Sequence, residues 1–275
     1  MMHPFRSNYR NKHMEKTGRK TQNKVFRVVE DSVESCVLPV ALILVWVGAG
    51  ASGRLNTVVL PSFQTVADTL ISGILNGKLL LALGISIRRV LLGYLISSVL
   101  GISMGILIGL SKHGQKLTGL LIQILRPIPP IAWIPIVILW MGIGEESKVF
   151  LIFLGGFFTV LINVIDGIRY TDKKLTEVAW VMETPKVKYI TRLVIPAAMP
   201  SIFTGLKVAL GSCWTCVVAA ELVASTSGIG YMISNARNFG QMDVVIVGML
   251  SIGLVGKMMD TILNEIGKRL LTWNT

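Results

Sequence analysis

The sequence contains little of what disulfide frameworks, metal centres and active sites are built from. It has three cysteines and three histidines among 275 residues. Cys36, Cys213 and Cys216 all fall inside apolar runs, so they predict no disulfide framework. Cys213 and Cys216 have the spacing of metal ligands, but a metal site needs further ligands, and the histidines lie elsewhere. Small residues at a helix interface are the better interpretation of this pair.

Catalytic motifs are also missing. The sequence has no P-loop, no H-E-x-x-H zinc motif and no dinucleotide-binding fingerprint. A G-x-S-x-G match at Gly101, Ser103 and Gly105 lies within an apolar run. A nucleophile elbow instead connects a strand to a helix, so this match predicts no nucleophile. We therefore expect a protein that is not an enzyme and that holds no cofactor or metal of its own.

Charged residues are scarce and unbalanced. They make up 15% of the chain, with 27 Lys and Arg against 15 Asp and Glu, while 52% of the residues are hydrophobic. A nucleic-acid-binding protein would spread its basic side chains over a polar surface. Here the charges stand between long apolar runs, which is typical of a polytopic membrane protein. We expect no nucleic-acid partner.

The apolar runs predict an all-α membrane protein with six transmembrane helices. A spanning helix needs about 20 apolar residues, because each residue rises about 1.5 Å. Residues 1–34 carry eight Lys and Arg and are interpreted as a cytoplasmic tail. Residues 35–275 are expected to form a single transmembrane domain, with a Gly- and Ser-rich outer loop before the last span. The predicted spans are about 35–53, 90–110, 127–144, 149–168, 202–222 and 244–263.

The basic residues also predict an orientation. Placing both termini in the cytoplasm leaves six of the 27 Lys and Arg outside and 21 inside, and the reverse orientation would place 21 outside. The first arrangement is favoured because cytoplasmic loops carry an excess of Lys and Arg. The polar segment 169–201 then lies in the cytoplasm.

Small residues recur every four positions in the second predicted span, at Gly93, Ser97, Gly101, Gly105 and Gly109. Such a stripe lies on one face of a helix and lets another helix approach closely in lipid. Packing within the same chain is favoured over a seam between two copies.

Polar and aromatic residues inside the spans mark candidate positions along a pathway, since a polar side chain in hydrocarbon costs a few kcal/mol unless it is partnered. Asn163 and Trp214 are two such candidates. Lys257 and Asp260 are expected to pair, because they lie three residues apart on one helix face. Glu221 has no partner nearby in sequence, and both a role at a gate and a structural role in pairing or capping remain open.

Prolines exclude a regular helix at the start of the third span. Each proline of Arg126-Pro127-Ile128-Pro129-Pro130 removes a backbone donor and disfavours helix in the residue before it. Irregular backbone at membrane depth is tolerated only inside protein or along a water-filled path. Pro129 and Pro130 are therefore further candidates for the pathway.

The segment from Thr176 to Pro200 resembles the EAA loop of the permease subunits of binding-protein-dependent ABC importers. The family pattern is E-A-A-x3-G-x9-I-x-L-P, and it runs without a gap through Glu177, Ala179, Leu193, Ile195 and Pro196. Other stretches look like the nitrate, sulfonate and taurine branch of that family, among them RPIPPIAWIPIVILWMGIG, NVIDGIR and DTILNEIGKRLLTW.

Two residues depart from the pattern. Val178 replaces the second alanine, and Glu183 stands where the family has glycine. That glycine lies at the turn between two short helices, where a left-handed backbone is easy for Gly and strained for Glu. Thr184 is expected to cap the second short helix, with Pro185 at its first position.

The resemblance implies the type I ABC-importer permease fold and its partners. Two copies of the chain would form the translocation path in the bacterial cytoplasmic membrane, in contact with lipid. A cytoplasmic ATPase, which holds ATP and Mg, would dock on the EAA loop, and an extracytoplasmic binding protein would deliver the solute. That solute is expected to be small and anionic, taurine or an alkanesulfonate before nitrate, bicarbonate or a small heterocycle. A self-contained secondary transporter or channel is the alternative.

Overall fold

The computed structural model describes residues 37–50, 52 and 60–270. The described residues divide into two units, one that ends at Ala67 and one that begins at Asp68. In the first unit, the apolar helix Val37–Gly50 carries Trp46, whose indole N–H donates to the carbonyl of Pro61 at 3.1 Å. The predicted tail, residues 1–34, and the ends of the predicted span 35–53 lie outside the described residues.

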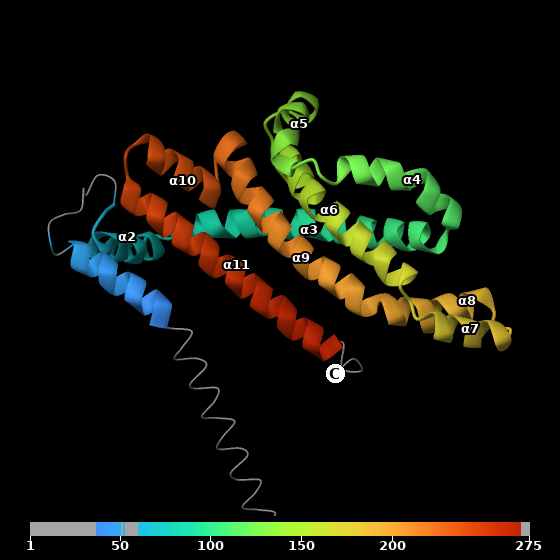
Figure 1. The fold of residues 1–275 in the computed structure, drawn as a ribbon. Coiled ribbons are helices and arrows are strands. Elements are labelled where there is room, and N and C mark those ends of the chain that lie inside the picture. Colours follow the sequence, from blue (N-terminus) through green and yellow to red (C-terminus); the bar gives the residue numbers. More distant parts are fainter. Residues whose placement is uncertain (1–36, 51, 53–59, 271–275) are drawn as a thin grey trace, which may run out of the picture. The chain divides into compact units, whose positions relative to one another are not determined.

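The second unit is helical, and no strand occurs anywhere in the described part of the chain, so the all-α prediction is confirmed (Figure 1). Its helices are joined by short turns, and α2 begins just before the boundary between the units. The elements are α2 (Phe63–Leu75), α3 (Lys78–Leu110), α4 (Lys112–Leu125), η1 (Pro130–Trp133), α5 (Ile134–Met141), α6 (Glu145–Arg169), α7 (Lys173–Val181), α8 (Lys186–Tyr189), the π-helical turn η2 (Ile190–Val194), α9 (Ile195–Ala224), α10 (Ile229–Asn238) and α11 (Met242–Leu270).

Four helical stretches in the described residues are long and apolar enough to cross a membrane. These are α3, α6, the continuous stretch from α8 through α9, and α11. A fifth results if α4 and the pair η1–α5 count as one broken span, bent by 86°. The first predicted span, 35–53, corresponds to Val37–Gly50, which is a shorter apolar helix.

The centre of the second unit is the contact of α6 with α3 on one side and with α9 on the other. The small-residue stripe of α3 faces α6. A methyl group added at Gly101 would lie 2.8 Å from Val160, and one at Gly105 would lie 2.6 Å from Val164. The two backbones can approach this closely only because the stripe lacks side chains. The prediction that the stripe packs within the chain is confirmed.

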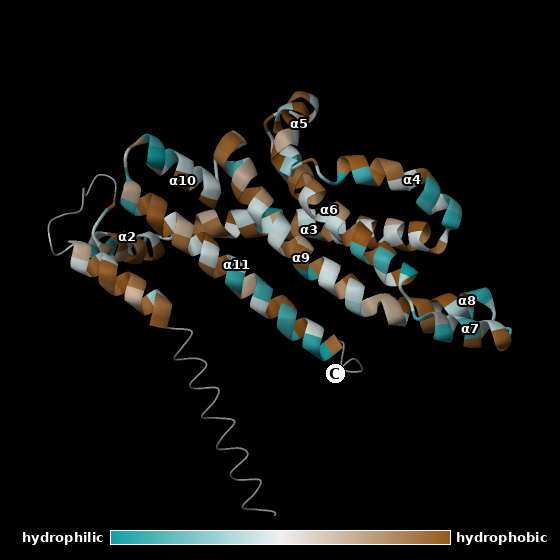
Figure 2. Ribbon diagram, in the orientation of Figure 1, coloured by the Kyte–Doolittle hydropathy of each residue, from teal (hydrophilic) through white to brown (hydrophobic). Residues whose placement is uncertain are grey.

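The cysteine pair lies on the opposite side of α6, in the contact with α9. The Cys213 thiol donates to the carbonyl oxygen of Ile152 at 3.4 Å, and Cys216 lies against Gly155. The interpretation of the pair as small residues at a helix interface is confirmed. Exposed positions of the long helices carry large apolar side chains instead, as at Leu107 and Leu254. Figure 2 shows that hydrophobic residues recur along these helices. That distribution suits a lipid environment.

Three predicted boundaries need correction. The helix predicted at 90–110 begins at Lys78, because the backbone breaks only at Gly77, which has φ 70°. The span predicted at 127–144 is helical over Pro130–Met141, since the prolines separate it from α4 and Gly142, with φ 74°, follows it. Residues 195–201, assigned to the loop 169–201, form the first turns of α9, where Pro196 is compatible with a helix start.

Two further predictions are wrong in detail. The Gly- and Ser-rich segment before α11 contains the helix α10 rather than an irregular loop. Asp260 does not pair with Lys257, because its carboxylate lies 3.8 Å from the ammonium of Lys207 on α9. The partner across the bundle, rather than along the helix, is the nearer cation.

The contact between α3 and α6 predicts a sharp difference between two glycines of α3. Gly105→Ala places a methyl group against Val164 and should lower the free energy of unfolding by about 1–3 kcal/mol, as overpacking does. Gly84→Ala is the matched control, since nothing lies within 4 Å of its added methyl group. Thermal unfolding in detergent measures both. Equal melting temperatures for the two variants would contradict this packing.

Candidate functional site

The segment that matches the EAA pattern forms two short helices at one end of the bundle, opposite α10 (Figure 1). We call residues 173–194, which include α7, α8 and η2, the α7–α8 segment. Asp172 caps α7, its carboxylate accepting the N–H of Lys174 at 2.9 Å. η2 joins α8 to α9 without a break in the helical path. The segment is therefore attached to the bundle through a continuous helix.

The turn after α7 has the geometry expected for the family glycine. Glu183 has φ 50°, and among the described residues it is the only non-glycine residue with positive φ. Its N–H donates to the carbonyl of Trp180 at 3.0 Å, and the N–H of Thr184 donates to that of Ala179 at 3.1 Å. These two bonds make a Schellman motif, in which the left-handed position normally holds glycine. The turn that the family pattern places here is present, and its backbone is left-handed although Glu183 replaces the glycine.

The start of α8 differs from the prediction by one residue. The helix begins at Lys186 and Pro185 occupies the N-cap position, with no hydrogen bond from a capping side chain. Thr184 was expected to be that cap, but its N–H closes the Schellman motif instead. The Pro185 carbonyl accepts the first helical bond, from Tyr189 at 3.0 Å.

The surface of the α7–α8 segment exposes large apolar side chains among its charged ones. Trp180, Val181 and Met182 are each at least 73% exposed, and Glu177 beside them is exposed as well. Ala179 is buried, and a cavity of about 570 Å³ between α7, α8 and Leu110 of α3 lies next to it. Exposed large apolar side chains gathered in this way mark an interaction surface, for another protein or for a membrane.

The end of the EAA pattern anchors this surface to the bundle. Val194 is buried in a cluster with residues of α6 and α9, and Leu193 packs against that cluster. Ile195 and Pro196 are half-buried at the start of α9. The pattern thus contains both an exposed part, near Glu177, and an attached part.

The predicted pathway residues do not gather at one place. Trp214 lies in the core between α9 and α11, where its indole N–H donates to the carbonyl of Ile252 at 3.0 Å. The amide of Asn163 donates to the carbonyl of Thr159 at 2.8 Å and packs on α9. Pro129 and Pro130 border a separate apolar cavity of about 240 Å³ near Ala219. Their role in a pathway stays a prediction.

Glu221 is the member of that set with the most elaborate surroundings. Its carboxylate is fully buried, accepts the hydroxyl of Ser86 at 2.8 Å, and lies 2.6 Å from a guanidinium nitrogen of Arg89. It also accepts the N–H of Gly230 at 2.9 Å, at the start of α10, where negative charge stabilises a helix. Of the two possibilities left open, pairing and capping are what the structure shows.

Arg89 is the centre of this network, and the sequence analysis did not select it. It is 2% exposed, yet it meets Glu145 through two bonds of 2.7 and 2.5 Å and Glu221 through a third. The carbonyl and hydroxyl oxygens of Ser227 lie at 2.7 and 2.8 Å from its other N–H groups. The Lys148 ammonium, also buried, lies 3.0 Å from Glu145. The positive charges of Arg89 and Lys148 therefore balance the negative charges of Glu145 and Glu221.

Family and fold comparisons agree with this architecture. A model of the binding-protein-dependent transport system inner membrane component matches residues 97–271. The chain belongs to this family of ABC-importer permeases. The matched residues include the whole α7–α8 segment and Glu221, but they begin after Arg89.

Individual relatives extend over most of this permease. A Bacillus subtilis protein named as an aliphatic sulfonates transport permease, SsuC, is 41% identical over 88% of this chain and 87% of its own. The Escherichia coli taurine transport system permease protein TauC is 31% identical over 85% of this chain and 86% of its own. The nitrate import permease protein NrtB of Leptolyngbya laminosa is 31% identical over 90% of each chain.

Solved structures share the permease fold at low sequence identity. A chain of an amino acid ABC transporter crystallised with histidines has a TM-score of 0.61 over 73% of this chain and 98% of its own, at 13% identity. A chain of the inward-facing MetNI methionine ABC transporter, in its native crystal form, has a TM-score of 0.53 over 67% of this chain and 95% of its own, at 15% identity. The predicted type I importer permease fold is confirmed.

The left-handed turn yields one prediction. Glu183→Gly should raise the free energy of unfolding by about 1 kcal/mol, because glycine adopts this backbone without strain at its Cβ. Glu183→Ala is the control, since it removes the charge but keeps the Cβ. Thermal unfolding of the purified permease distinguishes them. A gain of similar size in both variants would assign the effect to charge rather than to backbone strain.

The buried ionic network yields a second prediction. Arg89→Leu leaves Glu221 buried without its cation, so the free energy of unfolding should fall by about 3–5 kcal/mol. Arg88→Leu, at the exposed neighbouring position, should change it by about 0.5 kcal/mol or less. The double variant Arg89→Leu with Glu221→Leu should recover part of the loss, because no unpaired charge remains on Glu221. If Arg89→Leu unfolds like the unchanged protein, the network does not stabilise the fold.

Proposed function

We propose that this chain is the membrane permease subunit of an ATP-driven importer for small anionic solutes, with alkanesulfonates and taurine as the favoured class. The observation that carries the proposal is the exposed α7–α8 segment, which has the EAA spacing and the left-handed turn of the family. It stands on a bundle with the fold of importer subunits. The solute class rests on what the relatives are named for.

The α7–α8 segment would be the docking site of a cytoplasmic ATPase. Trp180, Val181 and Met182 offer an apolar surface, and exposed Glu177 and Lys186 add charges of both signs at its edge. A protein cleft that covers these side chains would gain hydrophobic free energy in proportion to the buried area. ATP and Mg would be held by that partner, since this sequence lacks a P-loop.

The excess of Lys and Arg in the segments assigned to the inside supports placing both termini and the α7–α8 segment in the cytoplasm. The membrane would be the bacterial cytoplasmic membrane, with lipid against the exposed apolar side chains of α3 and α11, such as Leu107 and Leu254. A second copy of the chain would complete the translocation path, and an extracytoplasmic binding protein would deliver the solute. Asn163, Pro129 and Pro130 are the residues proposed to border that path.

Docking can be tested at exposed residues. The double variant Glu177→Lys with Trp180→Ala should reduce co-purification of the ATPase by about tenfold or more, because it reverses a charge and removes the largest apolar contact. Solute uptake into proteoliposomes should fall with it. Ala179 is a poor choice for this test, since its side chain is buried and a bulky replacement would disturb the turn itself.

The matched control is Trp140→Ala, which removes a tryptophan from α5 that is 68% exposed, against 78% for Trp180. It should leave both ATPase binding and uptake unchanged. If the Glu177 and Trp180 variant assembles with the ATPase and transports normally, the docking assignment is wrong. Uptake by the purified chain without ATP or an ATPase would favour a self-contained secondary transporter or channel.

A further inference from the structure

A pocket of about 510 Å³ lies at the end of the bundle that carries α10, remote from the α7–α8 segment. It is bounded by α2, the first turns of α3, the loop before α10, α10 itself and the start of α11. Pockets of about 300–1,000 Å³ are the usual size for small-molecule ligands. None of the residues discussed above as pathway candidates lines it.

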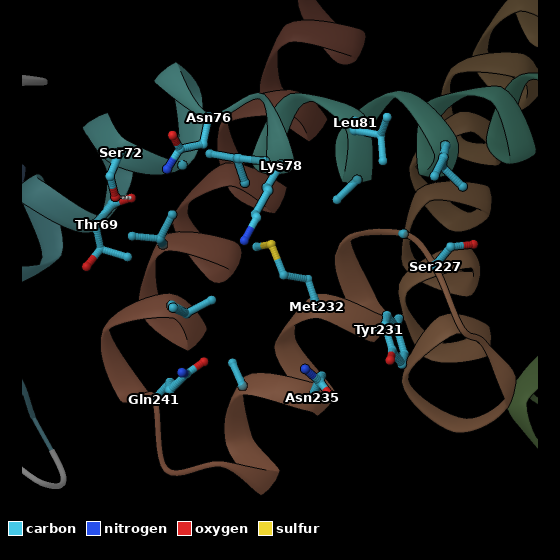
Figure 3. A pocket seen from close by; sticks show the side chains of 18 of the residues that line it. Thr69, Ser72, Asn76, Lys78, Leu81, Ser227, Tyr231, Met232, Asn235 and Gln241 are labelled. Atoms are coloured by element: carbon cyan, nitrogen blue, oxygen red, sulfur yellow. Dashed lines mark hydrogen bonds between the residues drawn. The ribbon is translucent and has the colours of Figure 1, made fainter.

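Lys78 alone among the side chains that line this pocket carries a charge. Figure 3 shows its side chain reaching from the start of α3 into the space beside Met232 of α10. The other polar lining groups are amides and hydroxyls, which can donate hydrogen bonds. They include Ser72, Asn76, Tyr231, Asn235 and Gln241.

One carboxylate that contacts a lining residue is already engaged. Asp243 accepts the hydroxyl of Thr69 at 2.6 Å, and it is Thr69 rather than Asp243 that lines the pocket. The pocket therefore combines a cation with hydrogen-bond donors and has no carboxylate among its lining residues. Such a set of groups favours an anion.

The wall opposite Lys78 is held by the buried network. Ser227 and Gly228 line the pocket, and Ser227 accepts two hydrogen bonds from Arg89. Gly228, with φ 103°, lies directly against the carboxylate of Glu221, so the loop has no room for a side chain there. Because both Arg89 and Glu221 are neutralised by their partners, the net charge facing the pocket comes from Lys78. The loop is thus preorganised without contributing a charge of its own.

We propose that this pocket is a binding subsite for a small organic sulfonate, with Lys78 as the partner of the sulfonate oxygens. The inference rests on the proposed function and locates a solute site on the permease itself. Asn76 and Asn235 line the same pocket, and their amide N–H groups would be the neutral donors to the remaining oxygens. The organic part of the solute would lie on the apolar wall made by Leu79, Ala82 and Val247.

The full transporter, with its ATPase, in phosphatidylcholine nanodiscs is the material for the test. Ethanesulfonate binding is measured by saturation-transfer NMR titration in the absence of the binding protein. Lys78→Gln should weaken the affinity about tenfold, the effect of losing one charge-assisted contact. Lys78→Arg should keep it within about threefold, because the charge remains. Lys116→Gln, an exposed lysine on α4, is the matched control and should have no effect.

A second variant does not depend on Lys78. Asn235→Leu removes a neutral donor at similar volume and should weaken ethanesulfonate binding without altering the charge of the pocket. Unchanged affinity in both Lys78→Gln and Asn235→Leu would overturn the subsite. In that case, normal ATP-driven sulfonate uptake would leave the proposed function standing. Absence of such uptake by the unchanged transporter would count against the function itself.

A lipid phosphate offers the same oxyanion chemistry, so the titration is repeated in nanodiscs that contain phosphatidylglycerol. Ethanesulfonate affinity that is independent of lipid composition supports a soluble solute. Loss of ethanesulfonate binding in phosphatidylglycerol, restored in phosphatidylcholine, would assign the pocket to an anionic lipid headgroup and would overturn the sulfonate assignment.

Discussion

Arg89 can be buried only if its charge and its N–H groups are met by partners, and two helices and a loop are arranged to meet them. Taking such a charged group out of water costs several kcal/mol of free energy, and well-placed ionic and hydrogen-bond partners must offset this cost. α6 supplies Glu145, α9 supplies Glu221, and the loop before α10 supplies Ser227. Apolar contacts between helices are not directional, so sliding one helix along another by a turn changes their contact free energy little. The guanidinium has fixed directions, and these set the register of the helices around α3.

Close packing makes that arrangement possible. One turn beyond Arg89, Gly93 lies against Ile152, and the stripe continues at Gly101 and Gly105. In lipid the hydrophobic effect does not hold helices together, so shape and polar contacts must. The missing side chains let α6 approach α3 until the start of α6 reaches the guanidinium. The ammonium of Lys148 then offsets the negative charge of Glu145. The small residues and the buried ions depend on each other. Larger side chains on α3 would hold α6 too far away for the helices to pack closely or for Arg89 to contact Glu145.

Features with local causes were predictable from the sequence, and those with distant causes were not. The prolines after Arg126 predicted the break before α5, and the family spacing predicted a turn at Glu183. Arg89 and Glu221 lie 132 positions apart in the sequence, so their pairing has no local signal. An arginine at the edge of an apolar run looks like a residue that flanks a span on the outer side of the membrane. α10 was missed for a related reason: the groups that meet its first N–H donors, Ser86 and Glu221, belong to other helices. A Gly- and Ser-rich stretch without its own cap resembles a loop.

The same helix links the two ends of the bundle. The helical path from Lys186 to Ala224 is continuous, and at about 1.5 Å per residue it extends for roughly 58 Å. It begins in the α7–α8 segment and carries Glu221 near its other end. Pro200 lies inside it and removes one backbone hydrogen bond, so the softest point is close to the α7–α8 segment. Beyond Pro200 the helix is packed against α6 and α11.

A displacement of α8 large enough to move this packed part of the helix would also move Glu221. Because Glu221 is bonded to Arg89, the movement would be passed on to the loop that walls the Lys78 pocket. Coupling between the two ends therefore needs no chain of small side-chain shifts, because a single helix contacts both.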